Sequence, residues 1–122
     1  MSDSPLAQLR AAAESVRQQL QLSAYDAAAV QQLAKIIEAQ RRGITPATRQ
    51  GIIISLGAFL GQCLVESFQG QWAAGPDGTT GVGIRGQLFF NPFYRVAQQL
   101  EHGVAASVAD FYAALAGRLA QS

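Results

Sequence analysis

A long segment of almost unbroken apolar residues, from Thr45 to Phe68, dominates the hydrophobic pattern of the chain. Thr45 followed by Pro46 is typical of a helix start, because the hydroxyl accepts from free N–H groups and proline suits the first turn. We expect Gly70 to end this helix as its C-cap. At 100° per residue only one narrow polar stripe remains: Thr48, Gly51, Ser55, Gln62, Glu66 and Gln69. The pattern therefore predicts a long central helix that is buried on several sides.

Two glycines inside this segment indicate a close helix crossing. Gly57 and Gly61 are four residues apart and share one face. Each costs about 1 kcal/mol relative to alanine in a helix interior, so we expect another element to approach them closely. A membrane dimer motif is the alternative. The apolar run from Ile52 to Val65 falls short of the roughly 20 residues that span a bilayer, so we predict no membrane partner.

Two amphipathic helices precede the central segment. Ser4-Pro5 predicts the start of the first, and its apolar positions recur at helical spacing. These positions are Leu6, Leu9, Ala13, Val16 and Leu20. Ser23 with Asp26 resembles a capping box that opens the second helix, and Gly43 ends it after Arg41-Arg42. The inward positions of the second helix are Val30, Leu33, Ile36 and Ile37.

The pattern changes to short alternating segments after Phe68. Gln71–Ala74, Val82 with Ile84, and Gln87–Phe90 are strand candidates. The turn sequence Gly75-Pro76-Asp77-Gly78 separates the first two. Short turns between consecutive strands predict an antiparallel meander.

Two further helices close the chain. Asn91-Pro92 predicts the start of one, which ends at Gly103, and Ser107 with Asp110 opens the last as a capping box. Helices and strands are thus segregated along the sequence. We expect an α+β fold in which a three-stranded antiparallel meander packs against about five helices around the long central one.

Composition limits the organisation of the chain. Its 122 residues suit one α+β domain over 1–122, with an N-terminal helical pair at 1–43 and a core at 44–122. Only 14% of residues are charged and the net charge is +1, so we expect no nucleic-acid partner. The single cysteine, Cys63, excludes an internal disulfide and suits a small core residue. The start, MSDSPLAQLR, lacks a signal pattern, and a cytoplasmic location is expected.

Motifs for cofactors are weak. The segment from Gly81 to Gly86 matches G-x-G-x-x-G, yet a turn precedes it and a strand candidate follows, where a dinucleotide site needs a strand and then a helix. The one histidine, His102, and the one cysteine show no metal-ligand spacing. We expect no cofactor and no metal.

The polar stripe of the central helix is the strongest candidate site. One interpretation is that it is the solvent edge of the helix. The other is that it lines a cleft between helix and sheet, with five ligand-binding residues: Ser55, Gln62, Glu66, Trp72 and Arg85. Glu66 would then be the one central carboxylate, without an evident acid partner. Binding is therefore favoured over catalysis.

Several motifs taken together resemble a family of small bacterial proteins of unknown function. They are an L-G-x-x-x-G-E/Q helix at Leu56–Gln62, a tryptophan strand at Trp72, an N-P-F helix at Asn91–Phe93, and an S…F-Y helix at Ser107–Tyr112. The match spans roughly Gly51 to Leu115, and the family often has Glu where this chain has Gln62. The resemblance implies one α+β domain in a bacterial cytoplasm and transfers no activity.

These observations favour a non-catalytic interaction module of unknown partner, such as an accessory or immunity-type protein. The alternative is a small-ligand binding domain with a pocket beside the polar stripe. We also expect a homodimer, because the first helix lies outside the family-like stretch and has a thin apolar face. The competing interpretation is that the first helix packs on its own central helix.

Overall fold

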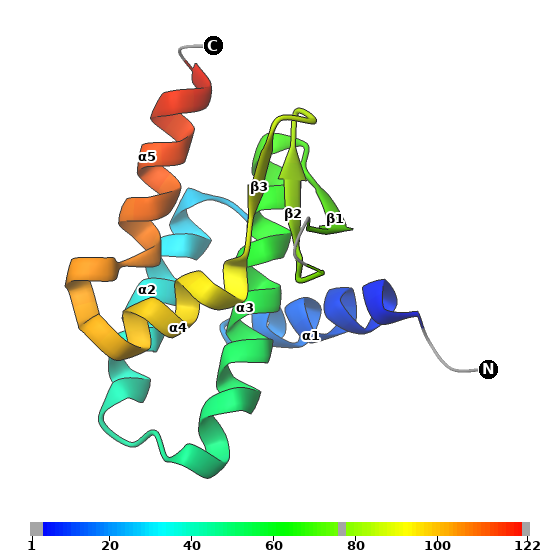
Figure 1. Ribbon diagram of the computed structural model, residues 1–122. Helices are drawn as coiled ribbons and strands as arrows, with labels where there is room; N and C mark the ends of the chain where they lie inside the picture. Colours follow the sequence, from blue (N-terminus) through cyan, green and yellow to red (C-terminus); the bar gives the residue numbers. More distant parts are fainter. Residues whose placement is uncertain (1–3, 76–77, 121–122) are drawn as a thin grey trace.

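The fold consists of five α-helices, one 3-10 helix and a three-stranded sheet within the residues that the structure, a computed structural model, describes: 4–75 and 78–120 (Figure 1). The elements follow in this order: α1 Pro5–Gln19, α2 Ala27–Arg41, α3 Pro46–Phe68, β1 Gln71–Ala74, β2 Thr80–Ile84, β3 Leu88–Phe90, α4 Pro92–His102, η1 Gly103–Ala106 and α5 Val108–Ala120. The predicted α+β class is confirmed, and α3 runs through the centre of the molecule.

The start of α3 is the one that the sequence predicts. The Thr45 hydroxyl accepts from the backbone N–H of Thr48, whose own side chain accepts from the Thr45 N–H, so the two form a capping box. The predicted C-cap at Gly70 is wrong by one residue, because Gln69 adopts the left-handed conformation with φ 56°. Gly70 is needed for space instead, since a Cβ there would lie 2.7 Å from Val82 Cγ1 in β2.

The second helix begins later than predicted. Asp26 is itself the N-cap, and its carboxylate accepts from the Ala29 N–H at 3.0 Å, so Ser23 lies outside α2. Tyr25 explains the difference: its hydroxyl donates to Glu14 in α1, and this bond holds residues 23–25 in the connection. The helix ends at Arg41 with Arg42 as its C-cap, one residue before the predicted end at Gly43.

The first helix packs across α3, in agreement with the competing interpretation of its apolar face (Figure 1). Ala13 and Val16 are buried, whereas Leu6 and Leu9 nearer the N-terminus are half-buried. The apolar face of α1 is therefore covered in its second half by the same chain. Association of two copies stays a prediction.

The three strands form the predicted antiparallel meander in the order β1-β2-β3. Trp72 pairs with Val82, and Val82 pairs with Phe90. The predicted third strand is shorter by one residue at Gln87. Of the predicted turn at 75–78, Pro76 and Asp77 lie outside the described residues, and the Gly78 N–H donates to the Gly75 carbonyl at 3.0 Å.

The glycine motif in β2 serves strand packing. A Cβ at Gly81 would clash with the Phe90 carbonyl oxygen, and Gly86 adopts φ 68° in the turn to β3. A strand, not a helix, follows the motif. The close-packing interpretation of this motif is therefore the one that the structure supports.

The last two helices are joined by η1, which the sequence pattern did not indicate. Asn91 caps α4 through a bond from the Tyr94 N–H, and Gly103 ends it, as predicted. At the start of α5 the Ser107 hydroxyl accepts from the Ala109 N–H at 3.1 Å, one residue short of Asp110. A capping box between Ser107 and Asp110 is not what the structure describes.

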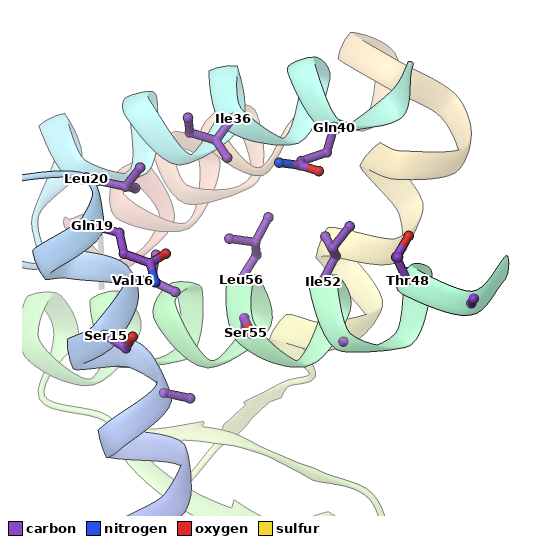
Figure 2. Close-up of a pocket in the computed structure, with 13 residues that line it drawn as sticks. Ser15, Val16, Gln19, Leu20, Ile36, Gln40, Thr48, Ile52, Ser55 and Leu56 are labelled. Atoms are coloured by element: carbon purple, nitrogen blue, oxygen red, sulfur yellow. The ribbon is translucent and has the colours of Figure 1, made fainter. Parts of the chain in front are cut away.

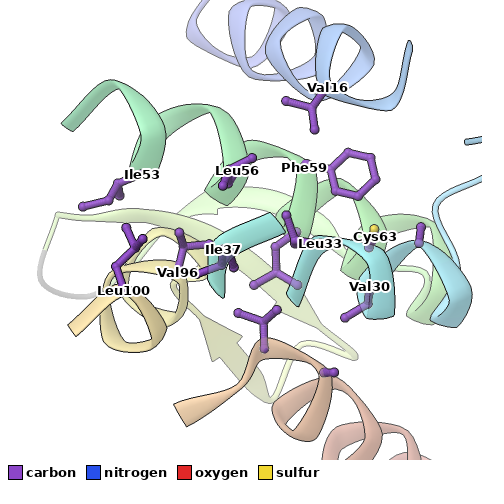
Figure 3. Packing of buried hydrophobic residues seen from close by; sticks show 14 residues of the cluster. Val16, Val30, Leu33, Ile37, Ile53, Leu56, Phe59, Cys63, Val96 and Leu100 are labelled. Carbon is purple, nitrogen blue, oxygen red and sulfur yellow. The ribbon is translucent and has the colours of Figure 1, made fainter. Parts of the chain in front are cut away.

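Two apolar clusters lie along α3. The larger joins all five α-helices around Phe59 and Leu33, with Val108 and Ala109 as the contribution of α5 (Figure 3). The smaller lies at the C-terminal half of α3, where the sheet residues Val82 and Ile84 meet Leu115 of α5. The position of α3 between them explains why it is apolar on most of its circumference.

The two glycines on one face of α3 mark close contacts, as predicted. A Cβ at Gly57 would lie 2.9 Å from the Phe93 Cα in α4, and one at Gly61 would overlap the Trp72 ring. Gly51, by contrast, has open space beside it, with no atom of the described residues within 4 Å of where a Cβ would lie. The crossing of α4 over α3 thus requires glycine at only part of the helix.

By length and composition α3 is also the one helix of the described residues that could cross a membrane. It has 23 residues and a mean hydropathy of 1.6 in its most apolar window, so the full helix meets the length criterion that the Ile52–Val65 run alone does not. Half of that window is buried inside the fold. The core helix of a folded domain meets the same criterion.

Candidate functional site

The residues of the polar stripe lie in two different surroundings. Gln62 is beside the sheet, where its Oε1 accepts from the Trp72 indole N–H at 3.2 Å. Ser55 lies two turns earlier and faces a groove between α1, α2 and α3 (Figure 2). The structure therefore brings Gln62 and Trp72 together and places Ser55 in a separate groove.

The two charged residues predicted for the site are exposed. Glu66 follows Gln62 by one turn on α3, and Arg85 occupies the turn after β2 with φ 57°. Trp72 is half-buried over Gly61, and its ring centroid lies 6.1 Å from that of Phe93. The Gln62 amide is thus committed to holding the indole in place against α3.

The groove that Ser55 lines is the candidate binding site. It has a volume of about 680 Å³, within the range that proteins use for small ligands. In Figure 2 the side chains of Ile36 and Gln40 on α2 point toward Ile52 and Thr48 on α3, and α1 closes one end with Val16 and Leu20. Each wall is a helix of the core, so the shape of the groove depends on how the three helices cross.

The floor of the groove is apolar and its rim is polar. The apolar lining comprises Ala12, Val16, Leu20, Ile36, Ala47, Ile52 and Leu56. Four polar rim side chains, Ser15, Gln19, Gln40 and Ser55, make no hydrogen bond within the part of the chain that the structure describes. Their donors and acceptors remain available to a bound molecule. An apolar surface with a few convergent polar groups is typical of binding sites.

None of the residues lining this groove is charged. A charged ligand group would lose its hydration without gaining a counter-charge, and such burial is costly. An uncharged molecule loses little on entering, and its polar groups can pair with the serine and glutamine side chains. The groove therefore offers no counter-charge to an ionic group.

Reactive chemistry is sparse elsewhere in the chain. Burial raises the pKa of the Cys63 thiol, with the charge of Asp26 as a smaller cause, so the thiolate is disfavoured. Within residues 4–75 and 78–120 no group of three or more His, Cys, Asp or Glu side chains could hold a metal ion. His102 is exposed at the end of α4.

A polar network that sequence reasoning missed connects α1 to the rest of the fold. Glu14 binds Arg17 and accepts from the Tyr25 hydroxyl at 2.8 Å. Ser67 in turn donates to the Tyr25 carbonyl and accepts from Tyr112 at 2.8 Å. The Glu14–Arg17 spacing on one helix was a visible signal, but the contacts to Tyr25 and Tyr112 depend on tertiary packing.

No family model, curated protein or solved structure matches this chain. The resemblance drawn from its motifs therefore stays a hypothesis.

Proposed function

We propose that the protein is a non-catalytic binding module, and that the groove between α1, α2 and α3 takes up a small, uncharged and largely apolar molecule. The observation that carries this proposal is the lining of the groove, which is apolar at the floor, polar at the rim and without charge throughout. It supports the small-ligand form of the binding hypothesis over a protein partner, because the volume suits a small molecule.

The residues of the rim suggest how such a ligand is oriented. Ser15 and Gln19 belong to α1, Gln40 to α2 and Ser55 to α3, so hydrogen-bonding groups come from three sides. A ligand with a hydroxyl, carbonyl or amide group can bind any of them while its apolar part covers Leu56 and Ile52. Ser55 is thus the one residue of the predicted site that has a place in this groove.

The test uses Nile red, an uncharged apolar dye whose fluorescence increases on leaving water. We expect saturable binding of the dye. Uncharged amphiphilic molecules are then screened for competition with the dye. Gly51→Leu should remove binding, because Gly51 lines the groove and a leucine side chain at this position has open space to enter. Gly117→Leu on α5 is the matched control, since the space beside Gly117 is equally open and it lies outside the groove.

The result separates the alternatives. Equal dye binding by Gly51→Leu and the wild type, with both proteins folded by circular dichroism, would show that the groove is not the binding surface. If no uncharged small molecule competes with the dye, the interaction-module hypothesis with a protein partner is favoured instead.

A further inference from the structure

A second groove, between α4, η1 and α5, is lined by the guanidinium of Arg95, which lies over an aromatic ring. Figure 1 shows α4 and α5 meeting at an angle and joined by η1. The groove has a volume of about 450 Å³. Its lining includes Tyr94, Arg95, Gln98, Ser107, Asp110 and Phe111. It shares no residue with the uncharged groove between α1, α2 and α3, which we call the neutral groove, and it lies on other helices.

Arg95 is half-buried and held in place by an aromatic ring. Its guanidinium carbon lies 4.4 Å from the centroid of the Phe111 ring, and Phe111 itself packs edge-on against Phe90 at 5.3 Å. This cation–π contact restricts the guanidinium plane. The side chain therefore does not sample the many conformations of an exposed arginine.

The guanidinium has no polar partner among residues 4–75 and 78–120. Within the described residues the Arg95 side chain makes no ion pair and no hydrogen bond, although the five N–H groups of its guanidinium are all donors. A guanidinium that is already oriented and unpaired matches a carboxylate, which accepts two parallel N–H bonds. The orientation of the guanidinium and its unused N–H donors favour the binding of an external anion.

The charge of the groove limits the anion to a single negative charge. Asp110 is exposed at the rim and contributes one negative charge against the one positive charge of Arg95. A dianion such as a phosphate monoester would meet too little positive charge. Apolar surface beside the guanidinium comes from Tyr94, a residue that is 55% exposed, and from Ala105, Ala106 and Ala114.

We propose that this groove is a binding site for a small monocarboxylate with an apolar or aromatic body. Arg95 holds the carboxylate through two N–H bonds, and the body of the ligand lies against Tyr94 and the alanines. Asp110 at the rim disfavours ligands with a second negative charge.

The experiment is a titration of the full chain with sodium benzoate, in which NMR monitors the chemical shifts of the backbone amides and the arginine side chains. Benzamide serves as the uncharged analogue and phenyl phosphate as the dianion. We expect saturable shifts at residues 94, 95, 98 and 111 with benzoate, and weak or no shifts with the other two. Gly51→Leu should leave benzoate binding unchanged. A negative result for the carboxylate site can therefore be told apart from a negative result for the neutral groove.

Three variants test the assigned roles. Arg95→Gln should weaken benzoate binding by about tenfold or more, as expected for a charge-assisted pair. Arg118→Gln, which removes an exposed arginine of α5 outside the groove, is the control and should bind as the wild type does. Asp110→Asn should strengthen benzoate binding and admit phenyl phosphate.

Two outcomes would overturn the proposal. One is equal binding of benzoate and benzamide, which would mean that the groove recognises only the ring. The other is benzoate binding that survives Arg95→Gln. If Arg95→Gln does not fold, Arg95→Lys replaces it, because lysine keeps the charge without the planar fork, and unchanged affinity would equally reject bidentate recognition.

Discussion

The Trp72 indole N–H donates to Gln62 Oε1 at 3.2 Å, and the same indole covers Gly61 one residue away on α3. The sequence pattern predicted that Gln62 and Trp72 line a ligand-binding pocket. In the structure the indole N–H and the Gln62 oxygen pair with each other, and this hydrogen bond and the packing of the ring on Gly61 attach β1 to the central helix.

This pair leads to the first prediction. Gln62→Leu should lower the free energy of unfolding by about 1–3 kcal/mol, because a half-buried indole N–H loses its acceptor. Gln62→Glu should cost much less, since the carboxylate still accepts. Urea midpoints measure both changes, and equal losses for the two variants would mean that the hydrogen bond is not what Gln62 contributes.

The glycines of α3 should respond oppositely to alanine. Gly57→Ala should destabilise the fold by about 1–3 kcal/mol, because the new methyl group meets the Phe93 backbone and α4 must shift. Gly51→Ala should stabilise it by about 0.5–1 kcal/mol, because the site is open and alanine favours the helix. Thermal or urea unfolding of the pair checks the sign, and two changes of the same sign would contradict the packing argument.

Gln99 is the one fully buried polar side chain among the buried residues that the structure describes. Its amide donates to Ala34 O and to Glu38, and its carbonyl accepts from the Val108 N–H at the start of α5. Gln99→Ala should therefore cost about 2–4 kcal/mol through a cavity and an unpaired buried N–H. Gln98→Ala on the same helix is the control, with an expected change in the free energy of unfolding of at most about 0.5 kcal/mol.

Glu14 should make stability depend on acid pH. Its hydrogen bonds from Arg17 and then Tyr25 lower the pKa of the carboxyl from 4.5 to about 2. Since the folded pKa is the lower one, the contribution is present above pH 4.5 and is lost as the pH falls toward about 2. Urea midpoints across this window should fall less for Glu14→Gln than for the wild type, and parallel curves would exclude Glu14 as a cause.

Cys63 offers a probe of global opening. The side chain is fully buried in the larger cluster, and burial raises the pKa of its thiol. A thiol reagent should therefore modify Cys63 only when unfolding exposes this face of α3. The modification rate should rise with urea in parallel with the unfolded fraction. Rapid modification in the absence of denaturant would show that the cluster opens locally.

Local patterns in the sequence determined most of the elements. Threonine or serine followed by proline fixed where α3 and α1 begin, because capping and the φ of proline act within one turn. Alternation and turn residues sufficed for the meander, and the glycine spacing indicated the close crossing on α3. Each of these signals depends on neighbours in the chain, which a sequence displays directly.

Tertiary structure decided which side chains from different elements meet. The start of α2 moved from Ser23 to Asp26 because Tyr25 is held by Glu14 from another helix. Helix periodicity placed Ser55 and Gln62 on one stripe, yet α1 and α2 form a groove beside Ser55 while the sheet brings Trp72 to Gln62. Arg95 and Phe111 likewise meet only through the angle between α4 and α5. These contacts depend on how helices cross, and crossing angles follow from side-chain packing over the whole core rather than from spacing along the chain.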